Sequence, residues 1–149
     1  MASYAFSDLS VGMTSRRSYL FSEERVEAFS ALVDDRAPVH VDAMFAKRQG
    51  FEGKIVHGLF VQSILSGMLG NEIPGPNSVI NSLSMKMHHP ILIGHAVEYE
   101  IHITALTPAV AAISLSFSGK VGGKIAISGK ALCSFPQLPQ PHPNLDSVR

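Results

Sequence analysis

A carboxylate, Asp35, and an imidazole, His40, lie five residues apart in the sequence, with Pro38 between them. A helix would place these side chains on different faces, but a loop fixed by Pro38 can direct both toward one water molecule. A carboxylate and an imidazole that share a water molecule can act as a general acid and base. The same spacing also occurs in ordinary loops, in which Asp35 caps the end of a helix or the loop itself and His40 starts an extended segment. The pair therefore indicates either acid–base chemistry or a plain turn.

Gly58 follows His57 at the expected start of a helix. The first N–H groups of a helix have no partner within it, and a residue without a side chain lets a ligand carbonyl approach closely. A thioester oxygen that becomes enolate-like needs such a donor. Alternatively, Gly58 only permits close packing and His57 caps the helix.

The segment 57–71 contains no Asp, Glu, Lys or Arg, which indicates a helix enclosed by other parts of the structure. Gly67 interrupts it and Gly70 is a candidate for its end. Its side chains suit either the wall of an acyl tunnel or an ordinary core; they are Leu59, Ile64, Leu65 and Leu69, with Ser63 and Ser66 among them.

The flanking elements follow from periodicity and from local signals. We expect a strand at 11–21, a helix at 23–34 with Ser22 as its cap, and a short helix at 43–48 capped by Asp42. Four β-type segments follow, at 78–87, 96–106, 111–119 and 124–135, with a tight turn at Gly122-Gly123. Four antiparallel strands after one apolar helix predict an α+β fold with a curved sheet wrapped around that helix.

Other candidate residues have simpler interpretations. The adjacent His88 and His89 resemble a metal pair, but neighbouring residues of a strand point to opposite faces, which favours a position on the surface. Cys133 is most simply a core thiol. Three lysines are expected on a solvated face of the sheet, although they could meet phosphates; they are Lys120, Lys124 and Lys130.

The composition limits the class of protein. Of the 149 residues, 46% are hydrophobic and 16% charged, with a net charge of zero, so neither a disordered chain nor a nucleic-acid-binding protein is expected. The low charge favours burial of some surface in an oligomer. The single cysteine fits a reducing cytoplasm, and neither a signal peptide nor a membrane span is recognisable. We expect one domain over residues 1–135 and a proline-rich tail over 136–149.

The motif Asp35-x-x-Pro38-Val39-His40-Val41-Asp42, followed by Phe45-Ala46, Phe51-Glu52 and Ile55-Val56-His57-Gly58, resembles the hydratase motif of MaoC-like, (R)-specific enoyl-CoA hydratases. The resemblance extends over roughly residues 8–135. It implies a hot dog fold, a curved antiparallel sheet around a long central helix that usually pairs into a homodimer.

The resemblance also implies a reaction, the reversible syn addition of water to a trans-2-enoyl thioester of CoA or of an acyl carrier protein, giving the (3R)-hydroxyacyl product. Asp35 and His40 match the catalytic pair that activates the water. Gly58 matches the glycine that polarises the thioester carbonyl, and Ser66 and Leu69 fall where similar enzymes line the acyl pocket. We expect neither a metal ion nor another cofactor.

Two positions depart from the family pattern. Ala37 stands where the family usually has Asn, and His95 stands where Asp is common. The substrate could therefore be a polar, short-chain or carrier-protein-bound acyl thioester handled by a specialised dehydratase. A non-catalytic module that binds acyl thioesters is a further alternative, and a thioesterase of the same fold is less favoured because the hydratase motif is present.

Overall fold

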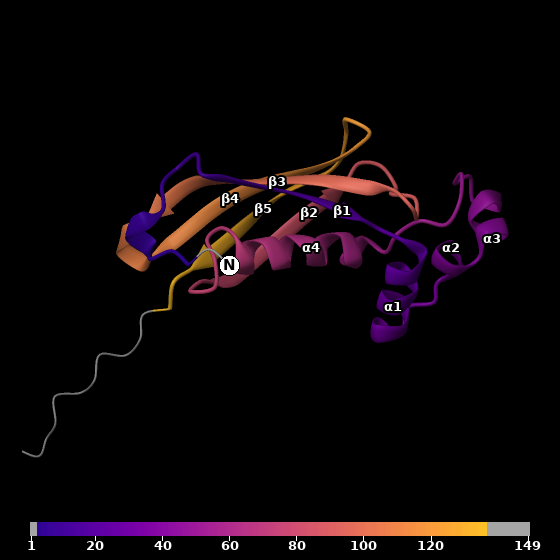
Figure 1. The fold of residues 1–149 in the computed structure, drawn as a ribbon, viewed down its shortest axis with the longest axis horizontal. Coiled ribbons are helices and arrows are strands. Elements are labelled where there is room, and N and C mark those ends of the chain that lie inside the picture. The colour runs from indigo at the N-terminus through magenta and orange to yellow at the C-terminus, as the bar shows by residue number, and fades with distance from the viewer. Residues whose placement is uncertain (1–2, 137–149) are drawn as a thin grey trace, which may run out of the picture.

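The computed structural model describes residues 3–136, which form one five-stranded antiparallel sheet with helices packed beside it (Figure 1). The strands are β1 (Thr14–Leu20), β2 (Val79–Met87), β3 (Ala96–Thr107), β4 (Ala112–Val121) and β5 (Lys124–Ser134). The helices are α1 (Glu23–Val33), α2 (Pro38–Val41), α3 (Ala43–Arg48) and α4 (Gly58–Asn71), with 3₁₀ turns at Phe6–Asp8 and Pro108–Val110. The strand order is β1-β3-β4-β5-β2, so β1 and β2 are the two edges of the sheet.

Helix α4 packs against the inner face of the sheet, which arches over it in Figure 1. The hydroxyl of the buried Tyr99, on β3, donates a hydrogen bond of 3.0 Å to the backbone carbonyl of Val61 in α4. The buried side chains of the helix are Phe60, Val61, Ile64, Leu65, Met68 and Leu69. These contacts confirm the predicted α+β architecture of a curved antiparallel sheet on an apolar helix.

The strands follow the alternation expected from the sequence. In β3, alternate side chains from Val97 to Ile103 are buried, and those between them face outward. Gly122 and Gly123 have φ angles of 55° and 80°, which form the predicted tight turn between β4 and β5. Gly129 permits a close approach, because a Cβ atom there would lie 2.0 Å from the carbonyl oxygen of Ser84.

The sheet covers only one side of α4. On the opposite side Leu59 is 73% exposed, and Ser63 and Ser66 are also exposed. The helix also continues past Gly70, the expected end, to Asn71. The apolar pattern of the sequence shows that the helix needs cover, but it does not show which surface supplies that cover.

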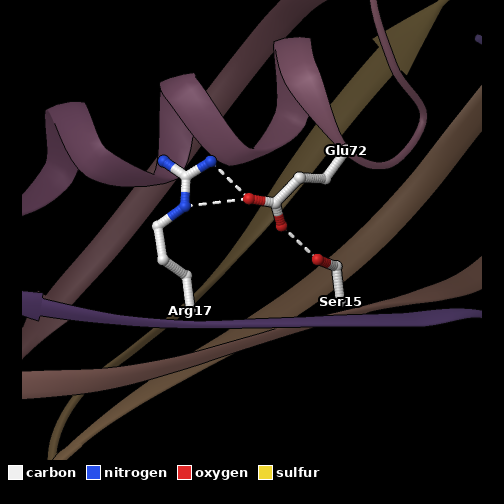
Figure 2. A network of polar contacts seen from close by, with 3 residues as sticks. All are labelled: Ser15, Arg17 and Glu72. Atoms are coloured by element: carbon white, nitrogen blue, oxygen red, sulfur yellow. Dashed lines mark hydrogen bonds and ion pairs between the residues drawn. The ribbon is translucent and has the colours of Figure 1, made fainter. Parts of the chain in front are cut away.

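A polar network anchors the C-terminal end of α4 to β1 (Figure 2). Glu72, the residue after the helix, accepts a hydrogen bond of 2.8 Å from the Arg17 Nε atom, together with bonds from the Arg17 Nη2 atom and from the hydroxyl of Ser15. The side chains of Arg17 and Glu72 are 32% and 25% exposed, so this ion pair is partly shielded from water.

Within residues 3–136, no helix has the length and apolar character needed to cross a bilayer. Apart from Pro136, the predicted proline-rich tail lies outside the described residues. The boundary expected between the domain and this tail stays a prediction.

Candidate active site

The candidate site lies at the N-terminal end of α4, where the segment after α1 passes close to the helix. Helix α1 begins as expected, because the side chain of Ser22 accepts a hydrogen bond from the backbone N–H of Arg25. It ends at Val33, and the left-handed conformation of the next residue, Asp34 (φ 54°), turns the chain sharply. The turn directs the next residue, Asp35, toward α4.

Two side chains hold the backbone of Asp35. Its carbonyl oxygen accepts a hydrogen bond of 2.5 Å from the hydroxyl of Ser30 and one of 3.0 Å from the Nε2 atom of His57. Its carboxylate is exposed, and the Oδ1 atom accepts a bond of 3.1 Å from the backbone N–H of Ala37. The second carboxylate oxygen remains available to a water molecule or a substrate.

His40 is also held in one orientation. Pro38 opens the helical turn α2, which contains His40. Residues 38–41 are thus helical, and the alternative in which His40 starts an extended segment is wrong. The Nδ1 atom of His40 lies 2.7 Å from the carbonyl oxygen of Ile55, and because a carbonyl only accepts, Nδ1 donates. The Nε2 atom is therefore the nitrogen left free for chemistry.

His57 is a third member of the site that sequence reasoning treated only as a possible helix cap. It occupies the cap position, but its side chain makes no capping hydrogen bond. Its ring is stacked on that of His40, with centroids 3.8 Å apart and planes inclined by 25°. Asp35, His40 and His57 each offer one oxygen or nitrogen atom within 4.8 Å of the others. In the sequence, the place of His57 in the Ile55-Val56-His57-Gly58 part of the motif was the signal that could have pointed to this role.

These three groups include the donor atoms that a transition metal ion prefers, but the stacked rings do not suit one. An ion must lie about 2.1 Å from each nitrogen and close to the plane of each ring. The ring planes of His40 and His57 are inclined by only 25°, with centroids 3.8 Å apart. The two planes therefore intersect much farther than about 2.1 Å from the ring nitrogens, and no single ion can lie in both planes at bonding distance. The arrangement fits proton transfer better than metal coordination.

Gly58 is the first residue of α4, so its N–H has no partner within the helix. It borders an open hollow of about 500 Å³ beside Asp35. A Cβ atom at Gly58 would meet no other atom within 4 Å, which shows that the glycine faces this open space. The other residues that line the hollow are Phe29, Val33, His57 and Leu59.

The structure thus brings Asp35, His40 and Gly58 to one end of α4. Asp35 and Gly58 border this hollow, whereas His40 lines a smaller neighbouring one beside Ser30. The structure does not bring Ser66 or Leu69 to the hollow, because Ser66 is exposed on the outer side of α4 and Leu69, 1% exposed, belongs to the core. Their assignment to an acyl pocket stays a prediction.

The remaining candidates lie away from the site. His88 and His89 are exposed, and His88 shares a hydrogen bond with the hydroxyl of Ser128 on β5. Cys133 is a buried core thiol, and burial raises its pKa to about 11. The three lysines expected on a solvated face are exposed, at Lys120, Lys124 and Lys130.

Residues 9–114 match the model of the MaoC-like domain. The chain belongs to the MaoC-like family. Among related proteins, the (R)-specific enoyl-CoA hydratase of Aeromonas caviae is 36% identical over 131 residues, covering 86% of this chain and 96% of its own. The 3-hydroxybutyryl-CoA dehydratase of Methylorubrum extorquens is 32% identical over 138 residues, covering 93% and 88% of the two chains. The family predicted from the motif is confirmed.

The fold of this MaoC-like protein also matches solved structures. A structure of the (R)-hydratase from A. caviae involved in PHA biosynthesis has a TM-score of 0.82 at 36% identity, over 86% of this chain and 98% of that chain. A structure of the R-hydratase PhaJ1 from Pseudomonas aeruginosa gives the same TM-score at 21% identity, over 97% and 96%, and supports the fold alone. The expected hot dog fold is therefore confirmed.

Proposed function

We propose that this MaoC-like protein is a hydro-lyase that interconverts trans-2-enoyl-CoA and (3R)-hydroxyacyl-CoA by adding and removing water. The observation that carries the proposal is that the Asp35 carboxylate lies within 4.8 Å of the His40 ring and shares a hollow with Gly58, whose N–H has no partner within the helix. The activity agrees with the enzyme class named for the relatives from A. caviae and M. extorquens.

The roles of the three groups follow from their chemistry. The thioester carbonyl oxygen accepts a hydrogen bond from the N–H of Gly58, where the positive end of the helix dipole stabilises the charge that develops on it. Asp35 and the free Nε2 atom of His40 hold a water molecule. As the water oxygen bonds to C3, this pair takes one proton from it and delivers one proton to C2. Addition from a single side gives the syn product.

The acyl group would lie against the apolar part of the hollow. Phe29, Val33 and Leu59 line it, and Val33 and Leu59 are 48% and 73% exposed. The exposed side chains suit a bound acyl chain, or a partner that closes the hollow. A polar, short-chain or carrier-protein-bound substrate is a second candidate, favoured by Ala37 in place of the usual Asn.

We further propose that the protein is a homodimer. The outer side of α4 has no charged side chain, and β2 is an edge strand with Val79 and Ile80 47% and 37% exposed. A second copy of the chain would cover these surfaces and would bring Ser66 of α4 into a subunit interface. Light scattering after size-exclusion chromatography should give the dimer mass, and a monomer at micromolar concentration would contradict the proposal.

The single cysteine is buried and unpaired, which supports a reducing compartment such as the cytoplasm. This location stays a prediction.

The activity is tested with a panel of enoyl-CoA thioesters of different length and polarity, followed by chiral analysis of the products. We expect hydration of at least one short or medium substrate to the (3R) product. Binding without turnover across the panel, and with the corresponding carrier-protein thioesters, would instead indicate a non-catalytic module. A (3S) product would contradict the proposed geometry.

A further inference from the structure

His57 contacts both members of the proposed catalytic pair, yet the proposed reaction assigns it no proton. Its side chain is buried, with 2% exposed. The Nε2 atom lies 3.0 Å from the carbonyl oxygen of Asp35, and the ring is stacked on His40. The residue is therefore almost fully buried and bonded within the chain, although its ring borders the hollow.

The hydrogen bond to Asp35 fixes the tautomer of His57. A carbonyl oxygen only accepts, so the proton must be on Nε2. The Nδ1 atom is buried and has no hydrogen-bond partner among residues 3–136. The structure thus suits a ring that donates one hydrogen bond from Nε2 and keeps Nδ1 without a partner among these residues.

The stacked ring fixes His40 from one side. Its Nδ1 atom is already bonded to the carbonyl of Ile55, and the face of His57 prevents the ring from tilting in that direction. Phe29 also packs against His57, with ring centroids 5.3 Å apart and planes inclined by 58°. His57 is thus enclosed and cannot move away without moving its neighbours.

We infer that His57 is a positioning residue, which holds the backbone of Asp35 through Nε2–H and the ring of His40 by stacking, so that both groups face one water molecule. This inference rests on the proposed hydratase function and extends it. Ser30 is the second donor to the same carbonyl, so two side chains, from α1 and from the residue that precedes α4, hold Asp35.

The first experiment separates this role from simple packing. His57→Leu fills a similar space but cannot donate, whereas the amide of His57→Gln can donate from a position close to that of Nε2. We expect His57→Leu to lower kcat by about 10- to 100-fold, the effect of a small displacement of catalytic groups, with KM changed less than about threefold. His57→Gln should recover most of the loss. His102→Gln, at an exposed histidine on β3, is the matched control and should behave as wild type.

The second experiment asks whether His57 acts through Asp35. In an Asp35→Asn background, His57→Leu should lower kcat by less than about threefold, because the group that it positions no longer functions. The inference is overturned if the loss is as large as in the wild-type background. It is also overturned if His57→Gln is as impaired as His57→Leu while both remain folded by circular dichroism.

A third measurement does not depend on activity. Nitrogen-15 NMR of the imidazole rings should show His57 as the tautomer protonated on Nε2 near neutral pH. A proton on Nδ1 would overturn the inference. If the wild-type protein hydrates no thioester in the panel, the proposed function fails, and this measurement alone decides whether His57 holds Asp35.

Discussion

The two ends of α4 differ in whether their polar groups have hydrogen-bond partners within the chain. At the N-terminal end, Gly58 leaves its N–H free beside the open hollow, and Asp35 is exposed there. At the C-terminal end, Glu72 is bound by Arg17 and Ser15 from β1 (Figure 2). One end thus offers unsatisfied polar groups to a ligand, and the other has its partners within the chain.

The difference shows how a reactive helix end can be held still without being blocked. A free N–H group aids a reaction only if it does not have to reorganise as charge develops. The anchor at Glu72 and the bond from Tyr99 to Val61 fix the position of α4 from the far end and from the sheet. The N-terminal end can therefore remain open and still be well placed.

The largest effect should come from removing the acid–base pair at the open end. Asp35→Asn or His40→Ala should lower turnover at least about 100-fold, the scale of one general acid or base. Thermal unfolding should show both variants folded, because the Asp35 carboxylate is exposed and His40 lies outside the core. Folded variants with near wild-type rates on the best substrate would rule out this mechanism.

A methyl group at the open end should reduce activity without loss of stability. The Cβ atom of Gly58→Ala would enter the hollow, where a carbonyl must approach the N–H, and we expect kcat/KM to fall at least about tenfold. Alanine favours the helix over glycine by up to about 1 kcal/mol, so Tm should not decrease. Unchanged kinetics would show that the carbonyl binds elsewhere.

A smaller effect is expected at Ala37, whose N–H already donates to the Asp35 carboxylate. One added or lost hydrogen bond changes a rate by up to about tenfold. If alanine is an adaptation to the substrate, Ala37→Asn should lower activity on the best substrate of the panel. Kinetics on that substrate and on crotonyl-CoA decide the question. Higher activity of the variant on both would show that alanine only lowers the activity of the enzyme and is no adaptation to its substrate.

At the closed end we expect a change in stability alone. Arg17→Met removes the partner of a partly buried carboxylate and should lower the free energy of unfolding by about 1–2 kcal/mol. We expect kcat to stay unchanged, because the bond from Tyr99 to Val61 still holds α4 on the sheet. The neighbouring Arg16, on the exposed face of β1, pairs with Glu100 of β3. Arg16→Met is therefore the matched control and should show no measurable loss of stability. Urea titration of both variants tests this, and equal stabilities would show that the Arg17–Glu72 pair does not anchor α4.

The smallest effect concerns the reactivity of Cys133, which is paired across the sheet with Ile80 near the start of β2. Burial raises its pKa to about 11, so the folded protein keeps the thiol protonated at pH 9, where an unfolded thiol ionises. A thiol reagent should label the folded chain much more slowly than the urea-unfolded chain at that pH. Because the unfolded state loses this proton first, the contribution to stability is complete below about pH 8.5 and disappears as pH rises toward 11. Rapid labelling of the folded chain would contradict the burial.

Local signals explain which parts of the structure the sequence predicts. The caps at Ser22 and Asp42, the alternation in β3 and the turn at Gly122 depend on neighbouring residues, and all are found. The convergence of Asp35, His40 and Gly58 was expected through the motif rather than through periodicity.

Long-range contacts explain what the sequence did not predict. Arg17 and Glu72 are 55 residues apart, and no local pattern links them. The stacking of His57 on His40 requires the segment before α4 to return alongside α2, which only the folded chain reveals. The exposure of Leu59 depends on whether another surface covers it, and a periodic pattern does not contain that information.

Every side chain that lines the hollow lies in the segment from Phe29 to Leu59, and the described strands supply none of them. The sheet supports the helix but does not carry the reacting groups. The coding region for residues 29–59 could thus be exchanged between related proteins that share the same sheet. Substitutions on the outer face of the strands can then accumulate by drift, or in a directed-evolution library, with little consequence for the chemistry.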